Sequence, residues 1–188
     1  DIENEDSIKS ASEIASKDTK IDMVIVATGI LHDKGLMPEK SIKELSVDKF
    51  QKIFLTNTIG PALIAKYFLP LLNKEERSIF TAISARVSSI SDNRLGGWHS
   101  YRASKAALNM ILKNVAIEVG RSNKNAIIAG LHPGTVDSDL SKPFQAGVSD
   151  DKLFTPKYSA EKMLEVLNEL KPSDSGNLFD FNGLKIEF

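Results

Sequence analysis

The sequence of 188 residues contains no cysteine. This absence excludes disulfide bonds, thiolate nucleophiles and cysteine metal sites, and it is compatible with a reducing compartment. The sequence also lacks any apolar run near the roughly 20 residues that span a bilayer. The first ten residues, DIENEDSIKS, are acidic and do not resemble a signal peptide. We therefore expect a cytoplasmic protein with no membrane partner.

Charge of one sign is not in excess either. The chain has 24 Lys and Arg against 25 Asp and Glu, so its formal net charge is −1. No broad basic field is present to attract nucleic acid, and we expect no nucleic-acid partner. Internal repeats, low-complexity tracts and long linkers are also missing, which favours a single domain over residues 1–188.

What the sequence does contain is an alternation of helical and strand patterns. Helical periodicity predicts helices at residues 7–17, 46–72, 98–119 and 155–170, and apolar runs predict strands at 23–27, 78–84, 125–132 and 176–181. Ser46 is a predicted N-cap, Gly60-Pro61 a predicted kink, and Gly120 a predicted C-cap. The continuous apolar run at 23–27 indicates a strand buried on both faces.

This alternation is typical of an α/β fold, a doubly wound parallel sheet of the Rossmann type with helices on both faces. In such a sheet the carboxyl ends of the strands lie at one edge, where ligands bind. The segments that end the predicted strands are 27–29, 84–86 and 132–134. We expect all three to meet at that edge.

The stretch SYRASKAALNMI, residues 100–111, places Tyr101 and Lys105 four residues apart. At that spacing both side chains lie on one face of a helix. A nearby ammonium lowers the pKa of a phenol, which then becomes usable as an acid or base closer to neutral pH. The pattern alone more often marks a solvated pair on an exposed helix, because two common residues at this spacing recur by chance.

Asn57 is a polar residue among apolar positions of the predicted helix 46–72. In the buried middle of a helix its side chain must find hydrogen-bond partners. Together with the strand that ends in Ser84, Asn57 favours a functional site that includes Tyr101 and Lys105 over a solvated surface pair.

Five ordered blocks carry a resemblance over nearly the whole chain: DMVIVATGILHD, FLTNTIGPALIAKYFLPLL, SIFTAISARVSSISDN, GGWHSYRASKAALNM and LHPGTVDSDLS. They resemble the short-chain dehydrogenase/reductase family, and within it the C-factor-like carbonyl reductase branch. The resemblance implies an NAD(P)(H)-dependent oxidoreductase that transfers a hydride between nicotinamide and a carbonyl or alcohol substrate. It favours NADP(H) over NAD(H) and a homodimer or homotetramer.

The resemblance also implies roles for individual residues. Tyr101 is the proton donor or acceptor, Lys105 lowers the pKa of Tyr101 and holds the nicotinamide ribose, and Asn57 supports a proton relay. The implied catalytic set is Asn57, Ser84, Tyr101 and Lys105. The implied cofactor-binding set is Asp1, Ile2, Ala27, Thr28, Gly29, Tyr101, Lys105, Pro133, Gly134, Val136 and Ser138.

The catalytic serine is open to three assignments. The family usually ends this strand in Ser-Ser, where the second serine orients the carbonyl, but here the pair is Ser84-Ala85. Ser84 is the best candidate because it stands at the strand end, and Ser88 and Ser89 are the alternatives. The chemistry requires a hydrogen-bond donor because charge develops on the carbonyl oxygen.

Two further departures from the family affect the cofactor site. The family's N-N-A-G block reads Val26-Ala27-Thr28-Gly29, without either asparagine, and the glycine-rich T-G-x-x-x-G-x-G turn that binds pyrophosphate is missing. We therefore expect the first βαβ region of the fold to be missing from these 188 residues, which would begin about 55 residues late. We expect them alone to be inactive and to expose one edge of the strand at 23–27. These departures also favour the alternative function, a non-catalytic binding or signalling module.

The remaining polar residues have simpler interpretations. His32 has no companion at metal-ligand spacing, so we expect no metal site. His99 and His132 are interpreted as local hydrogen-bonding residues. Arg86 and Arg102 are interpreted as surface ion-pairing residues, with binding of a substrate carboxylate as the alternative.

Overall fold

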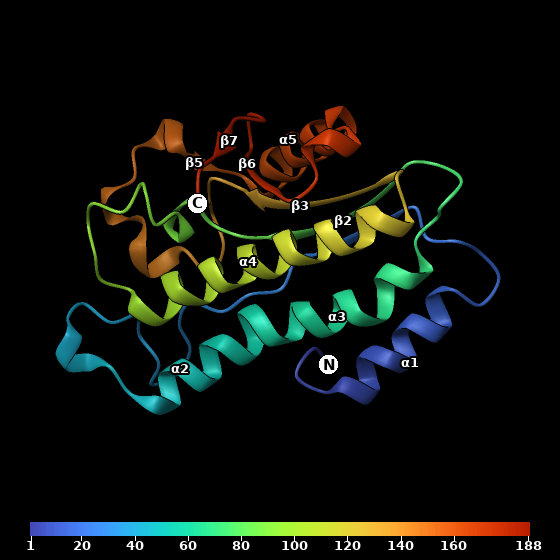
Figure 1. Ribbon diagram of the computed structural model, residues 1–188. Coiled ribbons are helices and arrows are strands. Elements are labelled where there is room, and N and C mark those ends of the chain that lie inside the picture. Colours follow the sequence, from blue (N-terminus) through green and yellow to red (C-terminus); the bar gives the residue numbers. More distant parts are fainter.

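The structure, a computed structural model, describes residues 1–188 and contains a five-stranded sheet covered by helices on both faces (Figure 1). The strands lie in the order β1 (Met23–Val26), β2 (Ser78–Ile83), β3 (Ala126–His132), β6 (Asn177–Asp180) and β7 (Lys185–Ile186). The first four run parallel, and β7 pairs antiparallel with β6. β4 (Thr135–Val136) and β5 (Leu153–Phe154) form a separate parallel pair. The expected doubly wound α/β fold is confirmed.

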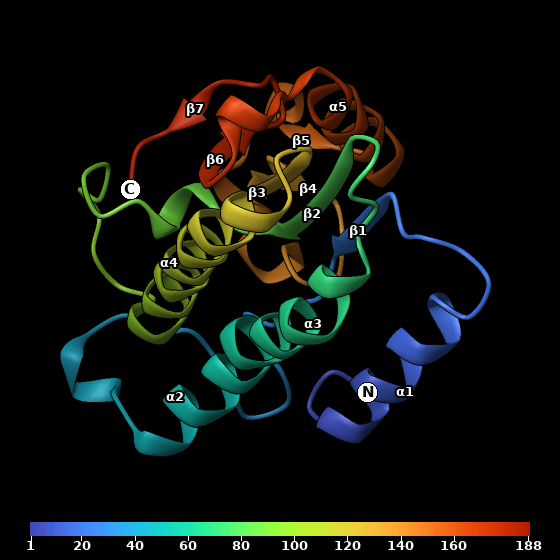
Figure 2. The same ribbon diagram turned by 45° about the vertical axis from the view of Figure 1, so that its right-hand side comes forward.

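Two helical layers enclose the sheet. The helices α1 (Glu5–Ala15), α2 (Val47–Phe54), α3 (Gly60–Phe68) and α4 (His99–Ser122) lie on one side, and α5 (Pro156–Glu169) lies on the other (Figure 2). Two apolar clusters fill the interfaces, one around Phe80 and Leu108 and the other around Ile127 and Leu167. Burial of these clusters is the main force that holds the layers together.

A side-chain cap begins α2 as the sequence predicts, and a second begins α5. The Ser46 hydroxyl accepts a hydrogen bond from the Lys49 main chain at the start of α2. Thr155 does the same for Tyr158, and Pro156 occupies the first turn of α5. The prediction that Gly120 ends α4 is wrong, since that helix continues to Ser122. Its last carbonyls find other donors, including the Lys124 ammonium, which binds the Gly120 carbonyl at 2.5 Å.

The predicted long helix at 46–72 is interrupted just before Gly60-Pro61. A π turn, Leu55–Ile59, separates α2 from α3, and the Gly60 N–H binds the Leu55 carbonyl. Pro61 lies in the first turn of α3, where a missing N–H costs little. Gly60 is required by close approach, because a Cβ atom there would collide with the Ile2 side chain.

The strand β1 differs from its prediction in burial. Met23 is 37% exposed and Ile25 is 43% exposed, so the strand is not buried on both faces. The reason is that β1 lies at the edge of the sheet and pairs only with β2. The apolar run therefore indicated the strand correctly but not the burial of its faces, while the expected exposed edge of this strand is present.

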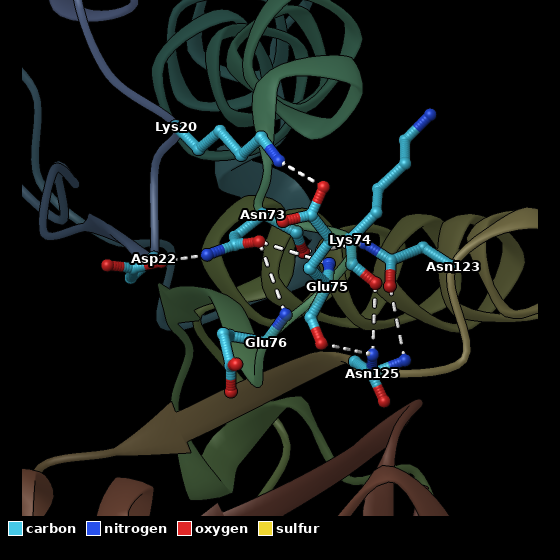
Figure 3. Close-up of polar contacts among 8 residues, drawn as sticks. All are labelled: Lys20, Asp22, Asn73, Lys74, Glu75, Glu76, Asn123 and Asn125. Atoms are coloured by element: carbon cyan, nitrogen blue, oxygen red, sulfur yellow. Dashed lines mark hydrogen bonds and ion pairs between the residues drawn. The ribbon is translucent and has the colours of Figure 1, made fainter.

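A polar cluster closes the edge of the sheet where β2 and β3 begin (Figure 3). The Asn73 amide donates to the Asp22 carboxylate at 2.9 Å, and its oxygen accepts from the main chains of Glu75 and Glu76. The Asn125 amide donates to the carbonyls of Lys74 and Glu75. These bonds fix the loop that leads into β2.

Of the helices in the structure, none has both the length and the apolar character of a membrane span.

Candidate active site

The three strand-end segments meet at one cavity of about 350 Å³, as the sequence predicts. The volume falls at the lower end of the range for small-molecule sites, about 300 to 1,000 Å³. The carboxyl ends of β1, β2 and β3 supply one wall, and α4 and the segment after β4 supply the others.

Tyr101 stands in the first turn of α4 and reaches this cavity. It is only 6% exposed and packs with Leu31 and Ala85. The Trp98 ring meets the Tyr101 ring edge-on at a centroid distance of 6.2 Å. Trp98 in turn contacts the Phe144 ring at 4.9 Å, so aromatic groups line the approach to the phenol.

Lys105 lies one helical turn further along and is 3% exposed. Its ammonium donates a hydrogen bond of 2.7 Å to the Ile83 carbonyl, and it lies 6.0 Å from the centroid of the Tyr101 ring. Both side chains line the cavity, so the interpretation as a solvated surface pair is excluded.

The pKa values of this pair depart from the sequence-based expectation. Burial raises the pKa of Tyr101 to about 12, and burial lowers the pKa of Lys105 to about 8. The expected lowering of the phenol pKa by the ammonium is therefore wrong for the protein by itself. The physical reason is that the ammonium binds the Ile83 carbonyl and not the phenol, so loss of water around Tyr101 dominates.

Asn57 is fully buried within the π turn and has the partners that its position requires. Its amide oxygen accepts from the Ile30 N–H at 2.8 Å, and its amide nitrogen donates to the Ile30 carbonyl at 2.8 Å and to the Ser104 hydroxyl at 3.2 Å. These bonds tie the turn after β1 to α4. Asn57 does not itself line the cavity.

Of the three candidate serines, only Ser84 lines the cavity. Its hydroxyl donates to the Asn109 side chain at 2.7 Å. The Asn109 amide donates to the Ser88 hydroxyl, which donates to the Ala85 carbonyl. Ser89 shares a hydrogen bond with the Ser91 hydroxyl. Ser84 remains the prediction, and its hydrogen must leave Asn109 to serve a substrate oxygen.

Most of the predicted cofactor residues are brought together. Those that line the cavity are Ala27, Thr28, Gly29, Tyr101, Lys105, Pro133, Gly134, Val136 and Ser138. Asp1 and Ile2 do not line it. The Asp1 main-chain nitrogen donates to the Ser7 hydroxyl, and Ile2 packs beside Gly60.

Two features of this wall leave space and a hydrogen-bonding group for a ligand. A Cβ atom at Gly29 would lie 3.3 Å from the Lys105 ammonium, so glycine at this position keeps space free beside that group. The Thr28 hydroxyl is buried without a hydrogen-bond partner, which leaves it available to a ligand.

His132 differs from its interpretation as a locally bonded residue. It lines the cavity at the end of β3, and its buried Nδ1 atom has no hydrogen-bond partner. Burial and, to a lesser extent, the Arg86 charge lower the pKa of His132 to about 4, and Asp180 opposes the shift. The imidazole is therefore neutral near pH 7.

The arginines and the loop beyond β4 complete the site. The Arg86 guanidinium pairs with the Asp92 carboxylate at 3.1 Å, which confirms its ion-pairing role, whereas Arg102 binds the carbonyls of Gly97 and Val87. Sequence reasoning missed Phe144, which packs against Trp98 from a 3₁₀ segment. No periodic signal marks it, because a short loop has no repeating face. The structure contains no group of three potential metal ligands.

A parallel α/β sheet with a buried tyrosine and lysine at its carboxyl edge defines a Rossmann-like oxidoreductase. The chain belongs to the short-chain dehydrogenase/reductase family, since residues 1–170 match the family profile described as enoyl-(acyl carrier protein) reductase.

Individual relatives agree with this assignment. The chain is 29% identical over 189 residues to the 1-hydroxy-2-glutathionyl-2-methyl-3-butene dehydrogenase of Rhodococcus sp. (strain AD45), covering 100% of this chain and 78% of that protein. It is 31% identical over 135 residues to the C-signal of Myxococcus xanthus, covering 72% of this chain and 76% of that protein. The NADPH-bound carbonyl reductase from chicken fatty liver superposes with a TM-score of 0.85 at 27% identity, covering 100% of this chain and 75% of that structure. The predicted family and the predicted NAD(P)-dependent oxidoreductase class are confirmed.

Proposed function

We propose that the protein interconverts an uncharged, largely apolar carbonyl compound and the corresponding alcohol, with NADP(H) preferred over NAD(H). The observation that carries this proposal is the burial of Tyr101 and Lys105 together at the carboxyl end of β2, beside the cavity. The preference for NADP(H) is supported by the NADPH-bound carbonyl reductase among the structural neighbours.

The chain's own residues account for the proton and for orientation. When bound, the nicotinamide cofactor supplies the hydride that reduces the carbonyl carbon. Tyr101 donates its phenolic proton to the carbonyl oxygen, and its raised pKa keeps that proton in place at neutral pH. The Lys105 ammonium favours the phenolate that remains, and Ser84 is the proposed hydrogen-bond donor to the carbonyl oxygen.

The lining of the cavity supports the choice of substrate. Leu31, Val87, Trp98 and Phe144 give it apolar walls. Arg86 is already engaged by Asp92 and Asp180, at 3.1 Å and 3.9 Å. A charged substrate would lose its water in a cavity with largely apolar walls, whereas an apolar carbonyl compound gains from burial.

The test is NADPH oxidation by the full natural chain with a panel of ketones and aldehydes. Tyr101→Phe should lower kcat by about 10² to 10⁴, because it removes the proton donor. Tyr67→Phe is the matched control, since the Tyr67 hydroxyl binds Glu5 away from the cavity. Full activity in Tyr101→Phe would contradict the proposal.

The alternative is a binding or signalling module that kept the fold and lost the reaction. It is favoured by Ala85, which packs against Tyr101 where the family usually has the catalytic serine. Calorimetric titration with NADPH separates the two, since no binding by the full natural chain would favour the module. Turnover with any carbonyl compound would exclude it.

We also propose that these 188 residues by themselves are inactive, because they contain no glycine-rich turn for the pyrophosphate. The cytoplasmic location and the homodimer or homotetramer remain predictions.

A further inference from the structure

Glu39 lies in the loop between β1 and α2 and is the one fully buried carboxylate of the structure, with 0% exposure. Its Oε2 atom accepts a hydrogen bond of 3.2 Å from the Ser100 N–H. Its main-chain oxygen accepts a second bond of 2.5 Å from the Trp98 N–H. One residue of a distant loop thus holds two of the three residues that precede Tyr101.

The entry into α4 needs such support. Gly96, Gly97 and Trp98 all have positive φ angles, of 64°, 66° and 50°. Trp98 is the only residue other than glycine with a positive φ, a conformation that persists only where its surroundings impose it. Trp98 occupies the N-cap position of α4, but its side chain makes no capping bond. The Glu39 carboxylate supplies that cap from outside the helix.

The state of the carboxylate fits this role. Burial raises the pKa of Glu39, but hydrogen bonds from Ser100 and from the Glu39 main chain outweigh it, so the pKa lies below its usual value. The Oε1 atom has no hydrogen-bond partner. A buried, half-satisfied carboxylate is costly, and its bond to the Ser100 N–H offsets part of that cost.

We propose that Glu39 is a positioning residue for Tyr101: by binding the Trp98 and Ser100 main chains, it sets where the first turn of α4 places the phenol. The inference rests on the proposed role of Tyr101 as proton donor. Because a displacement of about 1 Å at a reacting group can cost 10²-fold in rate, loss of the Ser100 bond should act on kcat more than on binding.

Three substitutions of Glu39 separate the effect of side-chain length from the effect of charge. Glu39→Gln keeps an oxygen within reach of the Ser100 N–H, so kcat should stay within about threefold of the wild type. Glu39→Asp keeps the charge but is one methylene shorter, and Glu39→Ala removes the acceptor. Both should lower kcat by about 10-fold to 100-fold, with KM for the carbonyl compound and Kd for NADPH within twofold. Glu44→Ala is the control, because it removes a carboxylate of the same loop that binds the Lys40 main-chain N–H and no group of α4.

A readout independent of catalysis comes from Trp98, the single tryptophan of the chain. Its fluorescence emission and near-ultraviolet circular dichroism report the contact with Tyr101. Both should change in Glu39→Ala and Glu39→Asp, and neither should change in Glu39→Gln or Glu44→Ala. If the wild type reduces no carbonyl compound, the proposed function fails, but these spectra still test the contact.

Two results would overturn the inference. One is unchanged spectra and kcat in Glu39→Ala. The other is full activity in Glu39→Asp with loss in Glu39→Gln, which would show that charge and not reach is needed. Should Glu39→Ala not fold, the comparison of Glu39→Gln with Glu39→Asp decides the matter alone.

Discussion

The Lys105 ammonium donates a hydrogen bond of 2.7 Å to the main-chain oxygen of Ile83, the last residue of β2. This bond ties the helix that carries Tyr101 to the end of a central strand. It also holds a cation inside the cavity, where burial lowers its pKa to about 8. The position and the charge of Lys105 are therefore both open to test.

The reduction rate should fall as pH rises through about 8, because Lys105 then loses the charge that favours the Tyr101 phenolate. Lys105→Met should lower kcat by about 10²-fold or more below about pH 8, and the difference from the wild type should shrink above that pH, where Lys105 is itself uncharged. Lys105→Arg keeps its charge and should move the falling limb to higher pH. The measurement is kcat against pH from 6 to about 10. A limb at the same pH in Lys105→Arg would contradict the assignment.

Ser84→Ala should lower kcat by about 10² to 10³, because it removes the hydrogen-bond donor proposed for the carbonyl oxygen. Ser88→Ala and Ser89→Ala should change kcat much less, since neither residue lines the cavity. Steady-state kinetics of the three variants decide between the serines. A larger loss in Ser88→Ala than in Ser84→Ala would reverse the choice.

Stability should fall with pH between 6.5 and about 4 because of His132. Its folded-state pKa of about 4 lies below the ordinary 6.5, so the unfolded chain binds a proton in this window that the folded chain does not. The contribution is present above pH 6.5, and up to about 3 kcal/mol is lost by pH 4. The measurement is the free energy of unfolding in urea, plotted against pH, and His132→Asn should flatten this plot between pH 6.5 and about 4. The control Asn73→Ala should lower the free energy of unfolding at every pH without changing its slope against pH. An unchanged slope in His132→Asn would count against the assignment.

Asn73→Ala should reduce the free energy of unfolding by about 0.5 to 1.5 kcal/mol, because Asp22 and two main-chain N–H groups exchange their partner for water. Kinetic constants should not change, since this cluster lies where β2 begins and the cavity lies where β2 ends. Lys74→Ala is the control, because the Lys74 side chain points away from the cluster (Figure 3). Denaturant unfolding and steady-state kinetics check both statements.

The sequence by itself predicted the order of strands and helices and the meeting of the strand ends at Gly29, Ser84 and Pro133. Periodicity and spacing suffice for these features because they follow from local backbone geometry. The same spacing placed Tyr101 and Lys105 on one helical face, and it could not tell whether that face meets water or protein.

Only the tertiary structure decided the features that depend on neighbours distant in sequence. The phenol pKa is raised because other segments exclude water from Tyr101, and the ammonium turns to Ile83. Met23 and Ile25 are partly exposed because β1 has a partner on one side only. Glu39 has no motif, yet it holds the start of α4, because packing brings its loop to Ser100 across 61 residues of chain. Desolvation and hydrogen-bond partners are properties of the packed chain, and local sequence does not encode them.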